Sequence, residues 1–187
     1  MTNKTIRSIK GTQDILPEES FKWQSLEDTI RKITSYYGYQ EIRTPAFEQT
    51  KLFSRGVGEE TDIVSKEMYS WTDQGGENLT LKPELTAPVA RAYIQHNLGG
   101  VSPVNKLYYI DALFRRERPQ KGRYRQFHQF GVEAFGSEHP EIDAEVIALA
   151  ISILKSVGLE SLQLNLNSIG SPECRKNYRT ALQEFLK

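Results

Sequence analysis

The sequence predicts an α+β fold in which an antiparallel sheet is flanked by helices. Two segments, around residues 17–37 and 142–157, carry apolar residues at the spacing of amphipathic helices. Between them, the extended segments 106–114 and 124–135 enclose a strongly basic loop and are best paired as antiparallel strands. Hairpins combined with helices favour a sheet of this kind, covered by the helices.

The first predicted helix has an apolar stripe whose members recur at spacings of three and four: Trp23, Leu26, Ile30, Ile33 and Tyr37. Pro17 suits the first turn and Gly38 the carboxyl cap, so we expect a helix of about 30 Å. The stripe is wide enough to lie on a sheet or on a partner subunit. Residues 39–44 then predict a strand that ends at Pro45, because proline cannot continue a central ladder.

Shorter elements are predicted in the middle of the chain. Residues 68–71 and 79–81 bracket the sequence DQGG, which indicates two strands joined by a turn. Thr86 is expected to cap a helix that runs to His96, with Pro88 in its first turn.

The last third of the chain predicts two more helices and a strand. The second apolar stripe ends at the capping residue Gly158 and comprises Ile142, Val146, Leu149, Ile153 and Val157. Residues 162–166 alternate leucine with polar residues, which is typical of a strand. Pro172 begins a final helix.

Composition is that of a soluble globular protein and narrows the possible chemistry. The 187 residues include 24 basic and 24 acidic side chains, so net charge indicates no polyanionic partner. No apolar run reaches bilayer length and residues 1–10 lack a signal-peptide stretch, so we expect a cytoplasmic protein without membrane contact. Cys174 is the single cysteine and the histidines are scattered, so we expect no metal site formed by these residues.

Positive charge is concentrated in the loop between the two long strands. Glu117 is the one acid among its basic side chains, which are Arg115, Arg116, Arg118, Lys121, Arg123 and Arg125. Guanidinium groups present paired donors that match phosphate oxygens, so the loop suits a triphosphate or a nucleic-acid backbone. Taken alone, the loop also fits a plain solvated turn.

Alternation along the second strand places an unusual set of side chains on one face: Phe127, Gln129, Gly131, Glu133 and Phe135. An amide and a carboxylate in mid-sheet need partners, and a small polar ligand can be one. Gly131 leaves a notch between them. Phe127 suits stacking on a purine base or plain core packing, while Glu84 and Thr86 suit a ligand ammonium group or a helix cap.

Several segments closely resemble bacterial histidyl-tRNA synthetases, which are class II aminoacyl-tRNA synthetases. The motif 2 hairpin of that family resembles residues 114–136, FRRERPQKGRYRQFHQFGVEAFG. Its amino-terminal signature resembles residues 10–17, KGTQDILP, and its motif 1 resembles residues 37–68. The segment that frames the amino-acid pocket resembles LTLKPELTAPVAR, and LNLNSIGSPECRKNYRTAL also matches. The resemblance covers essentially the whole chain.

The resemblance implies ATP-dependent activation of histidine to histidyl-adenylate, followed by transfer to tRNA(His). Carried over by position, it implies that Arg115 is the catalytic residue, which binds the α-phosphate and stabilises charge that develops there. It also implies that Glu117 contacts the adenine side of ATP, that Arg123 binds the distal phosphates and that Phe127 stacks on adenine. Magnesium is implied together with ATP.

For histidine, the resemblance implies a second group of residues. Glu84, Thr86 and Gln129 would receive the α-ammonium group, and Glu133 would face the imidazole. A homodimer formed through motif 1 is implied as well.

Residues 1–187 are expected to be the amino-terminal part of a class II catalytic domain, because motif 3 and the anticodon-binding domain have no counterpart in them. An end within an amphipathic helix favours a shortened chain over a separate short gene product. Motif 2 without motif 3 predicts a chain that keeps much of the ATP and histidine surface but lacks groups needed for full turnover. Lys82 replaces the family's usual arginine and Leu85 a frequent glycine, and neither change removes a ligand group.

Two other functions fit parts of the pattern. A synthetase-like regulatory subunit of ATP phosphoribosyltransferase shares the fold without aminoacylation, but it has no need for a complete ATP-binding hairpin. An RNA-binding module could use the basic loop as a phosphate clamp, but the neutral net charge argues against it. We therefore expect a histidine-tRNA ligase.

Overall fold

The computed structural model describes residues 5–57, 67–118, 120–167 and 170–186. Its larger sheet has the order β1 (Gln40–Glu41), β5 (Asn105–Phe114) and β6 (Gln126–Phe135). Its smaller sheet has the order β2 (Phe47–Gln49), β4 (Asn78–Leu81) and β3 (Ser70–Thr72). The helices are α1 (Pro17–Tyr36), α2 (Thr50–Val57), α4 (Thr86–Gln95), α5 (Leu98–Val101), α6 (Pro140–Ser156) and α7 (Pro172–Phe185).

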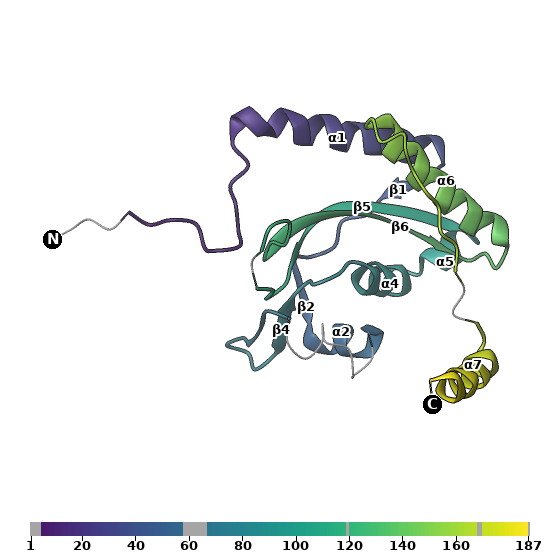
Figure 1. Cartoon of the computed structure of the whole chain (residues 1–187). Helices are drawn as coiled ribbons and strands as arrows, with labels where there is room; N and C mark the ends of the chain where they lie inside the picture. The colour runs from purple at the N-terminus through teal and green to yellow at the C-terminus, as the bar shows by residue number, and fades with distance from the viewer. Residues whose placement is uncertain (1–4, 58–66, 119, 168–169, 187) are drawn as a thin grey trace.

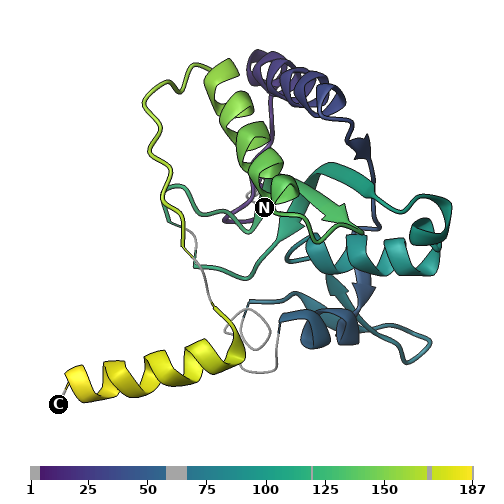
Figure 2. The same cartoon turned by 90° about the vertical axis from the view of Figure 1, so that its right-hand side faces the viewer.

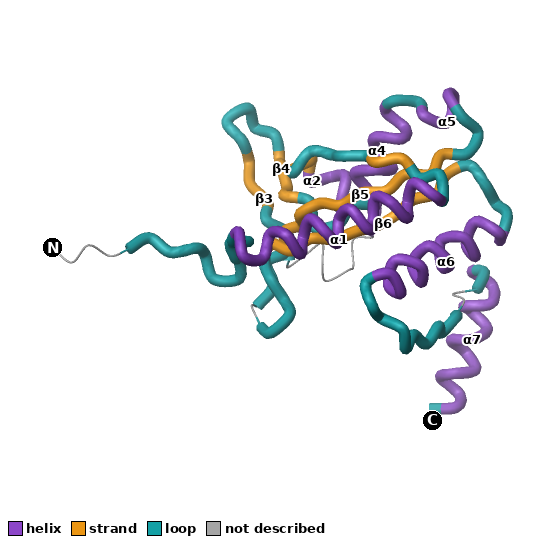
Figure 3. Tube along the Cα trace, turned by 90° about the horizontal axis from the view of Figure 1, so that it is seen from above, coloured by secondary structure: helices purple, strands orange, loops and turns teal. Residues whose placement is uncertain are grey.

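Helices cover both faces of the larger sheet (Figure 1). On one face α1 and α6 pack on the strands, and Figure 3 shows α1 lying along β5 and β6. On the other face α4 packs on the same strands. This arrangement confirms the α+β fold class with its helix-flanked sheet. No helix within the described ranges is both long and apolar enough to span a membrane.

The β5–β6 hairpin is the main scaffold of the larger sheet. Its strands pair antiparallel from Asn105 with Phe135 to Phe114 with Gln126, which confirms the predicted pairing. β1 is shorter than the predicted strand at residues 39–44 and runs parallel to β5. Ile42 adds one more bond, from its N–H to the Tyr108 carbonyl (2.8 Å), before the chain leaves the sheet.

The two predicted apolar stripes supply the first core. It lies between α1, α6 and the sheet and comprises Ile30, Ile33, Tyr39, Tyr108, Leu149 and Ile153. Trp23, also on the α1 stripe, contacts the His128 ring with centroids 4.8 Å apart. The apolar stripe of α1 therefore packs largely against the sheet of the same chain.

The second core lies between α4 and the opposite face of the sheet: Leu85, Val89, Leu107, Tyr109 and Leu113. α4 begins at Thr86, close to the predicted start, but Thr86 is the first helical residue and Leu85 precedes it as the N-cap. The prediction that Thr86 caps the helix is therefore wrong.

The smaller sheet contains the predicted β3–β4 hairpin and a third strand, β2, which was not predicted. The helix α2, which follows β2 in the chain, was not predicted either. The turn of the hairpin is closed by Asp73, whose Oδ1 accepts a hydrogen bond from the Glu77 N–H (2.8 Å). Phe47 and Trp71 meet edge to face across this sheet at 5.9 Å.

After α6 the chain departs from the prediction. Residues 162–166 are extended but belong to neither sheet, and their leucines are 38–74% exposed. The predicted strand is wrong because alternation supplies an apolar face, whereas a strand also needs a neighbouring strand to bond with. The final helix is confirmed as α7, and Figure 2 shows it lying apart from the sheets.

Candidate active site

The residues predicted to bind ATP or histidine lie on one face of the larger sheet, at the start of α4 and in the basic loop between β5 and β6. We call this face of the sheet the α4 face. It carries the odd-numbered residues of β5 and β6, since paired residues share a face. Phe127 and Phe135 pack there against the second core, while Phe130 and Val132 pack against the first core on the other face. The alternation predicted for this strand is therefore confirmed.

Arg115 follows β5 and is held in place on two sides. Its Nε donates a hydrogen bond to the Pro83 carbonyl (2.9 Å), and its guanidinium lies over the Phe127 ring, 5.1 Å from the centroid. The terminal nitrogens bond no other described residue, so they can donate to a ligand. The structure shows the core-packing alternative for Phe127, whose ring is partly buried against the second core, and stacking on a purine base stays a prediction.

In the basic loop, two predicted ATP ligands bind each other. The Arg123 guanidinium donates to Glu117 at 3.3 Å, and Arg125 donates from Nε to the Glu117 carbonyl at 3.4 Å. The Arg123 side chain is 62% exposed against 14% for Glu117, so Arg123 has room to move toward a ligand. The Arg125 N–H also anchors the loop by bonding the Gly11 carbonyl (2.6 Å).

Glu84 lies just before α4 and acts as a helix cap. Both of its carboxylate oxygens accept from the Ala87 N–H, at 3.1 and 3.2 Å. Burial raises the pKa of Glu84, and the nearby Glu133 carboxylate adds to this, whereas Arg115 and the bonds at the helix start oppose it. The structure therefore shows the capping alternative at Glu84 and leaves the carboxylate close to Arg115.

Glu133 holds the other end of the predicted site. Its Oε1 accepts from the Thr86 hydroxyl (2.8 Å) and from the Tyr109 hydroxyl (3.3 Å). Burial, together with the Glu133 carboxylate, raises the pKa of Tyr109, so this hydroxyl stays protonated as a donor. The contact between Thr86 and Glu133 brings two of the predicted histidine ligands together.

The notch predicted at Gly131 is filled by a side chain of this protein. Tyr109 lies opposite Gly131 in the hairpin, and a Cβ at position 131 would lie 2.3 Å from the Tyr109 hydroxyl oxygen. The prediction of an open notch for a ligand is therefore wrong. The sequence analysis did not single out Tyr109, although pairing the two strands residue by residue would have placed it beside Gly131 and Glu133.

Gln129 is exposed on the α4 face, opposite Asp111 in the ladder, and its side chain makes no hydrogen bond to another described residue. It stands between Phe127 and Gly131 on the strand, so the structure keeps it on the predicted face without assigning it a partner.

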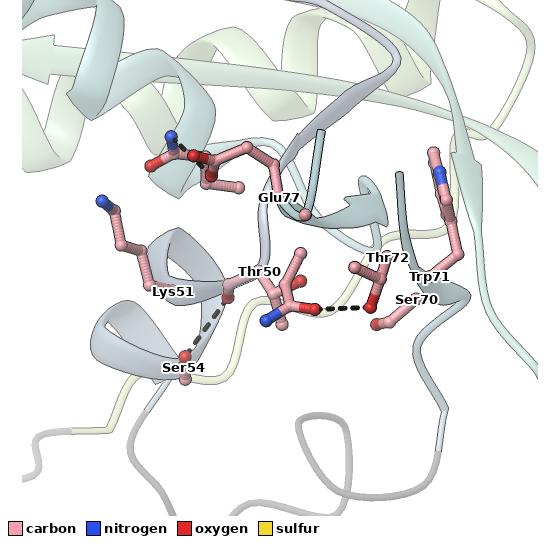
Figure 4. Close-up of a pocket in the computed structure, with 10 residues that line it drawn as sticks. Thr50, Lys51, Ser54, Ser70, Trp71, Thr72 and Glu77 are labelled. Carbon is pink, nitrogen blue, oxygen red and sulfur yellow. Dashed lines mark hydrogen bonds between the residues drawn. The ribbon is translucent and has the colours of Figure 1, made fainter. Parts of the chain in front are cut away.

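The structure contains one hollow that a predicted ATP ligand lines and a second hollow that none of the predicted ligands lines. One of about 210 Å³ is lined by Phe127 together with Gln13, Trp23, Tyr124 and His128. A larger one of about 520 Å³ lies between α2 and the β3–β4 hairpin, where Thr50, Ser54, Trp71 and Glu77 line it (Figure 4). None of the predicted ATP or histidine ligands lines this larger hollow, so we place the candidate site on the α4 face.

Residues 11–171 match the family model described as Histidyl-tRNA synthetase. The chain belongs to the histidyl-tRNA synthetase family. This membership confirms the resemblance drawn from the motif 2 hairpin and from the segment before α4.

Curated and solved relatives agree with this assignment. The histidine-tRNA ligase of Thermoanaerobacter pseudethanolicus is 58% identical over 181 residues, which are 97% of this chain and 43% of that protein. The apo S. aureus histidyl-tRNA synthetase structure is 45% identical with a TM-score of 0.79, and the match covers 95% of this chain and 41% of that one. The chain therefore spans less than half the length of these histidyl-tRNA synthetases.

A third match bears on the regulatory alternative. A Bacillus halodurans structure described as an ATP phosphoribosyltransferase regulatory subunit/histidyl-tRNA synthetase is 30% identical with a TM-score of 0.72. It covers 86% of this chain, which in turn spans 40% of that one. The lower identity makes the regulatory function the weaker alternative to a histidyl-tRNA synthetase.

Proposed function

We propose that this chain supplies the ATP- and histidine-binding surface of a histidine-tRNA ligase, which activates histidine as histidyl-adenylate and transfers it to tRNA(His). The observation that carries the proposal is the polarity of the α4 face in a chain of this family. Cationic groups, Arg115 and Arg123, lie at its loop end, and the carboxylates Glu84 and Glu133 lie toward α4. A nucleotide phosphate and an amino-acid ammonium group need these opposite charges.

At the loop end, Arg115 is the proposed catalytic residue. Its Nε is fixed on the Pro83 carbonyl, so its terminal nitrogens can contact the α-phosphate and stabilise the charge that develops during adenylate formation. Phe127 is proposed to stack on adenine, Glu117 to contact its polar edge and Arg123 to bind the distal phosphates. Binding would exchange the Glu117–Arg123 contact for bonds to ATP.

Toward α4, Glu133 is proposed to accept a bond from the histidine imidazole through Oε2, since Oε1 already accepts two bonds. Glu84, Thr86 and Gln129 are proposed to receive the α-ammonium group. The raised pKa of Glu84 falls again when that cation binds beside it, because a positive charge favours the carboxylate form.

Magnesium is proposed to enter with ATP. Mg²⁺ at such sites is held by substrate phosphates and one or two carboxylates. The described residues contain no group of three or more acidic, histidine or cysteine side chains placed to hold a metal ion, which fits an ion held mainly by the triphosphate. When bound, the ion would neutralise part of the phosphate charge.

The wider assembly is also proposed from the family. Residues 1–187 are proposed to be the amino-terminal part of the catalytic domain, with motifs 1 and 2, in a cytoplasmic homodimer formed through motif 1. The exposed pair Phe47 and Trp71, at 49% and 41% exposure, offers an apolar surface within or near motif 1. Sedimentation equilibrium of the parent and of Trp71→Ser tests this surface.

The deciding experiment is histidine-dependent exchange of labelled pyrophosphate into ATP by this chain, with every other amino acid as a control. Direct binding of ATP and histidine is measured by calorimetry on the same preparation. Exchange confined to histidine supports a complete adenylation site. Binding of both ligands without exchange supports the binding surface alone, and binding of neither contradicts the proposal.

A further inference from the structure

Lys82 is a charged residue buried in the middle of the fold. It follows β4 and is only 1% exposed. Its amine pairs with the Asp111 carboxylate on β5 and donates to the Thr44 carbonyl at 3.2 Å. Lysine is almost never buried this fully without a partner, so the pair is an integral part of this region.

The main chain around Lys82 leads directly to the candidate site. The Lys82 N–H bonds the Ala46 carbonyl, and the Lys82 carbonyl accepts from the Phe114 N–H, both at 3.0 Å. The next residue, Pro83, accepts the bond from Arg115 Nε. Glu84 follows with its carboxylate at the start of α4. The position of Lys82 therefore sets the positions of the groups that hold Arg115 and Glu84.

Asp111, the acidic partner of Lys82, connects the ion pair to the larger sheet. It lies on the α4 face opposite Gln129, and the neighbouring pairs on that face are Tyr109 with Gly131 and Leu113 with Phe127. Its Oδ1 accepts from the Ala112 N–H (2.7 Å), so the carboxylate has a fixed orientation. The ion pair thus joins β5, the segment before α4 and the chain that follows β1.

We propose that the Lys82–Asp111 ion pair is a positioning pair that sets the Arg115 guanidinium and the Glu84 carboxylate at the distance the two ligands require. The Lys82 side chain is 2% exposed and the Asp111 side chain is 29% exposed. An ion pair with one fully buried charge gives little net stability compared with apolar side chains of similar size, so stability alone does not account for it. Its three attachments fix one position for the Pro83 carbonyl, which an apolar pair would leave free to shift. This inference rests on the proposed function for the identity of the ligands.

The test replaces both charges together, as Lys82→Met with Asp111→Leu, because removing one partner alone would leave an unpaired buried charge. The matched control is Lys106→Met with Glu145→Leu. Lys106 likewise binds one carboxylate, Glu145 at 2.7 Å, and one carbonyl, that of Tyr37 at 3.3 Å. This control pair lies on the opposite face of the sheet, at the other end of β5.

The first measurement needs no ligand. Proton exchange of the Arg115 Nε–H, assigned with Arg115→Lys, is followed by ¹H–¹⁵N NMR in parent and variants. We expect the Lys82/Asp111 double variant to unfold at a temperature similar to the parent but to exchange this proton several-fold faster, while the control variant leaves it unchanged. An unchanged Arg115 signal in the folded Lys82/Asp111 variant would overturn the inference.

The second measurement is ATP affinity by calorimetry. We expect the Lys82/Asp111 variant to bind ATP about tenfold more weakly, because a misplaced guanidinium loses its bond to the phosphate. Full affinity in that variant would contradict a positioning role. If the parent itself binds no ATP, the proposed function fails, and the Arg115 exchange measurement still decides whether the ion pair positions this side chain.

Discussion

At the residue scale, the two carboxylate oxygens of Glu133 differ, because Oε1 accepts two hydrogen bonds from other described side chains and Oε2 accepts none from them. Oε1 accepts from Thr86 and Tyr109, and both donors come from elements other than its own strand. Two donors on one oxygen hold the carboxylate plane in place, so Oε2 points in a defined direction. The same logic holds at Arg115, where Nε is occupied and the terminal nitrogens remain free to donate to a ligand.

Tyr109→Phe removes one of the two donors to Glu133. We expect histidine affinity to fall by about 1 kcal/mol while ATP affinity is unchanged, because only the histidine end loses a bond. Calorimetric titration with each ligand measures the difference. Tyr108→Phe is the matched control, since its hydroxyl bonds Glu41 at the same 3.3 Å distance but on the other face. An equal loss of histidine affinity in the control would contradict the role given to Tyr109.

Arg115→Ala removes the proposed catalytic guanidinium. We expect ATP use in pyrophosphate exchange to fall far more than histidine affinity, since this side chain is proposed to bind the α-phosphate and to stabilise the charge that develops there. Arg118→Ala, an exposed basic residue of the same loop, controls for general loss of positive charge. Equal losses of ATP use and histidine affinity would show that the role assigned to Arg115 is wrong.

Glu84 predicts a pH effect with a definite sign. Its pKa is raised by burial above its ordinary value of 4.5, so the folded state holds the proton more tightly than the unfolded state. Its contribution to stability is present below pH 4.5 and is lost as pH rises through the raised pKa. We expect Glu84→Gln to gain stability relative to the parent over that interval. Urea unfolding at stepped pH values tests this, and a constant difference would contradict it.

At the element scale, the β5–β6 hairpin and the start of α4 assemble the site together. The hairpin supplies Arg115, Phe127 and Glu133 from its two strands and their ends, and α4 contributes Thr86 from its first turn. The strands hold their register over ten residues each, so strand geometry fixes the spacing between Arg115 at one end of the hairpin and Glu133 toward the other.

Gly131→Ala tests the packing within this hairpin. A Cβ at position 131 would meet the Tyr109 ring and hydroxyl at 2.3–2.5 Å, so Tyr109 must move away from Glu133. We expect a loss of about 1 to 3 kcal/mol in unfolding free energy, as for other overpacked positions. Gly75→Ala, in the exposed β3–β4 turn, is the control and should change stability little, because its nearest neighbour is the Asp73 carboxylate at 3.3 Å, which needs to shift by only a few tenths of an ångström. A similar small change in both variants would contradict the close contact.

At the scale of the whole molecule, burial is concentrated in the two cores on either side of the larger sheet. All described residues after Ile153 are exposed, including every one in α7. α7 is capped by Ser171, whose Oγ accepts from the Cys174 N–H at 3.1 Å, but it buries no residue within the described part of the chain. Among the described residues, α7 is therefore stabilised by the hydrogen bonds within the helix and at its Ser171 cap.

Hydrogen exchange should reveal this difference in burial. A helix of 14 residues without tertiary packing is marginal in water, so we expect amides of α7 to exchange far faster than those of β5 and β6. Mass spectrometry of peptides from residues 172–185 and 105–114 measures the contrast. Equal protection would mean that α7 packs against another surface in solution, such as a second copy of the chain.

The sequence by itself determined the elements whose signals are local. Apolar periodicity located α1 and α6, and the long alternating segments located β5 and β6, because each pattern records which face must leave water. The resemblance of the motif 2 hairpin identified the family, and strand alternation placed Phe127, Gln129 and Glu133 on one face. The same local reasoning predicted a strand at residues 162–166, where an apolar face exists without a bonding neighbour.

Only the tertiary structure decided which groups occupy the space between these elements. Tyr109 fills the place opposite Gly131, and Lys82 reaches Asp111 from a different sheet. Glu84 rather than Thr86 bonds the start of α4, which leaves the Thr86 hydroxyl for Glu133. Except for the cap itself, these contacts join residues that are 22 to 47 positions apart in the sequence. Periodicity cannot report such contacts, because it shows which face a residue lies on and not which residue it contacts.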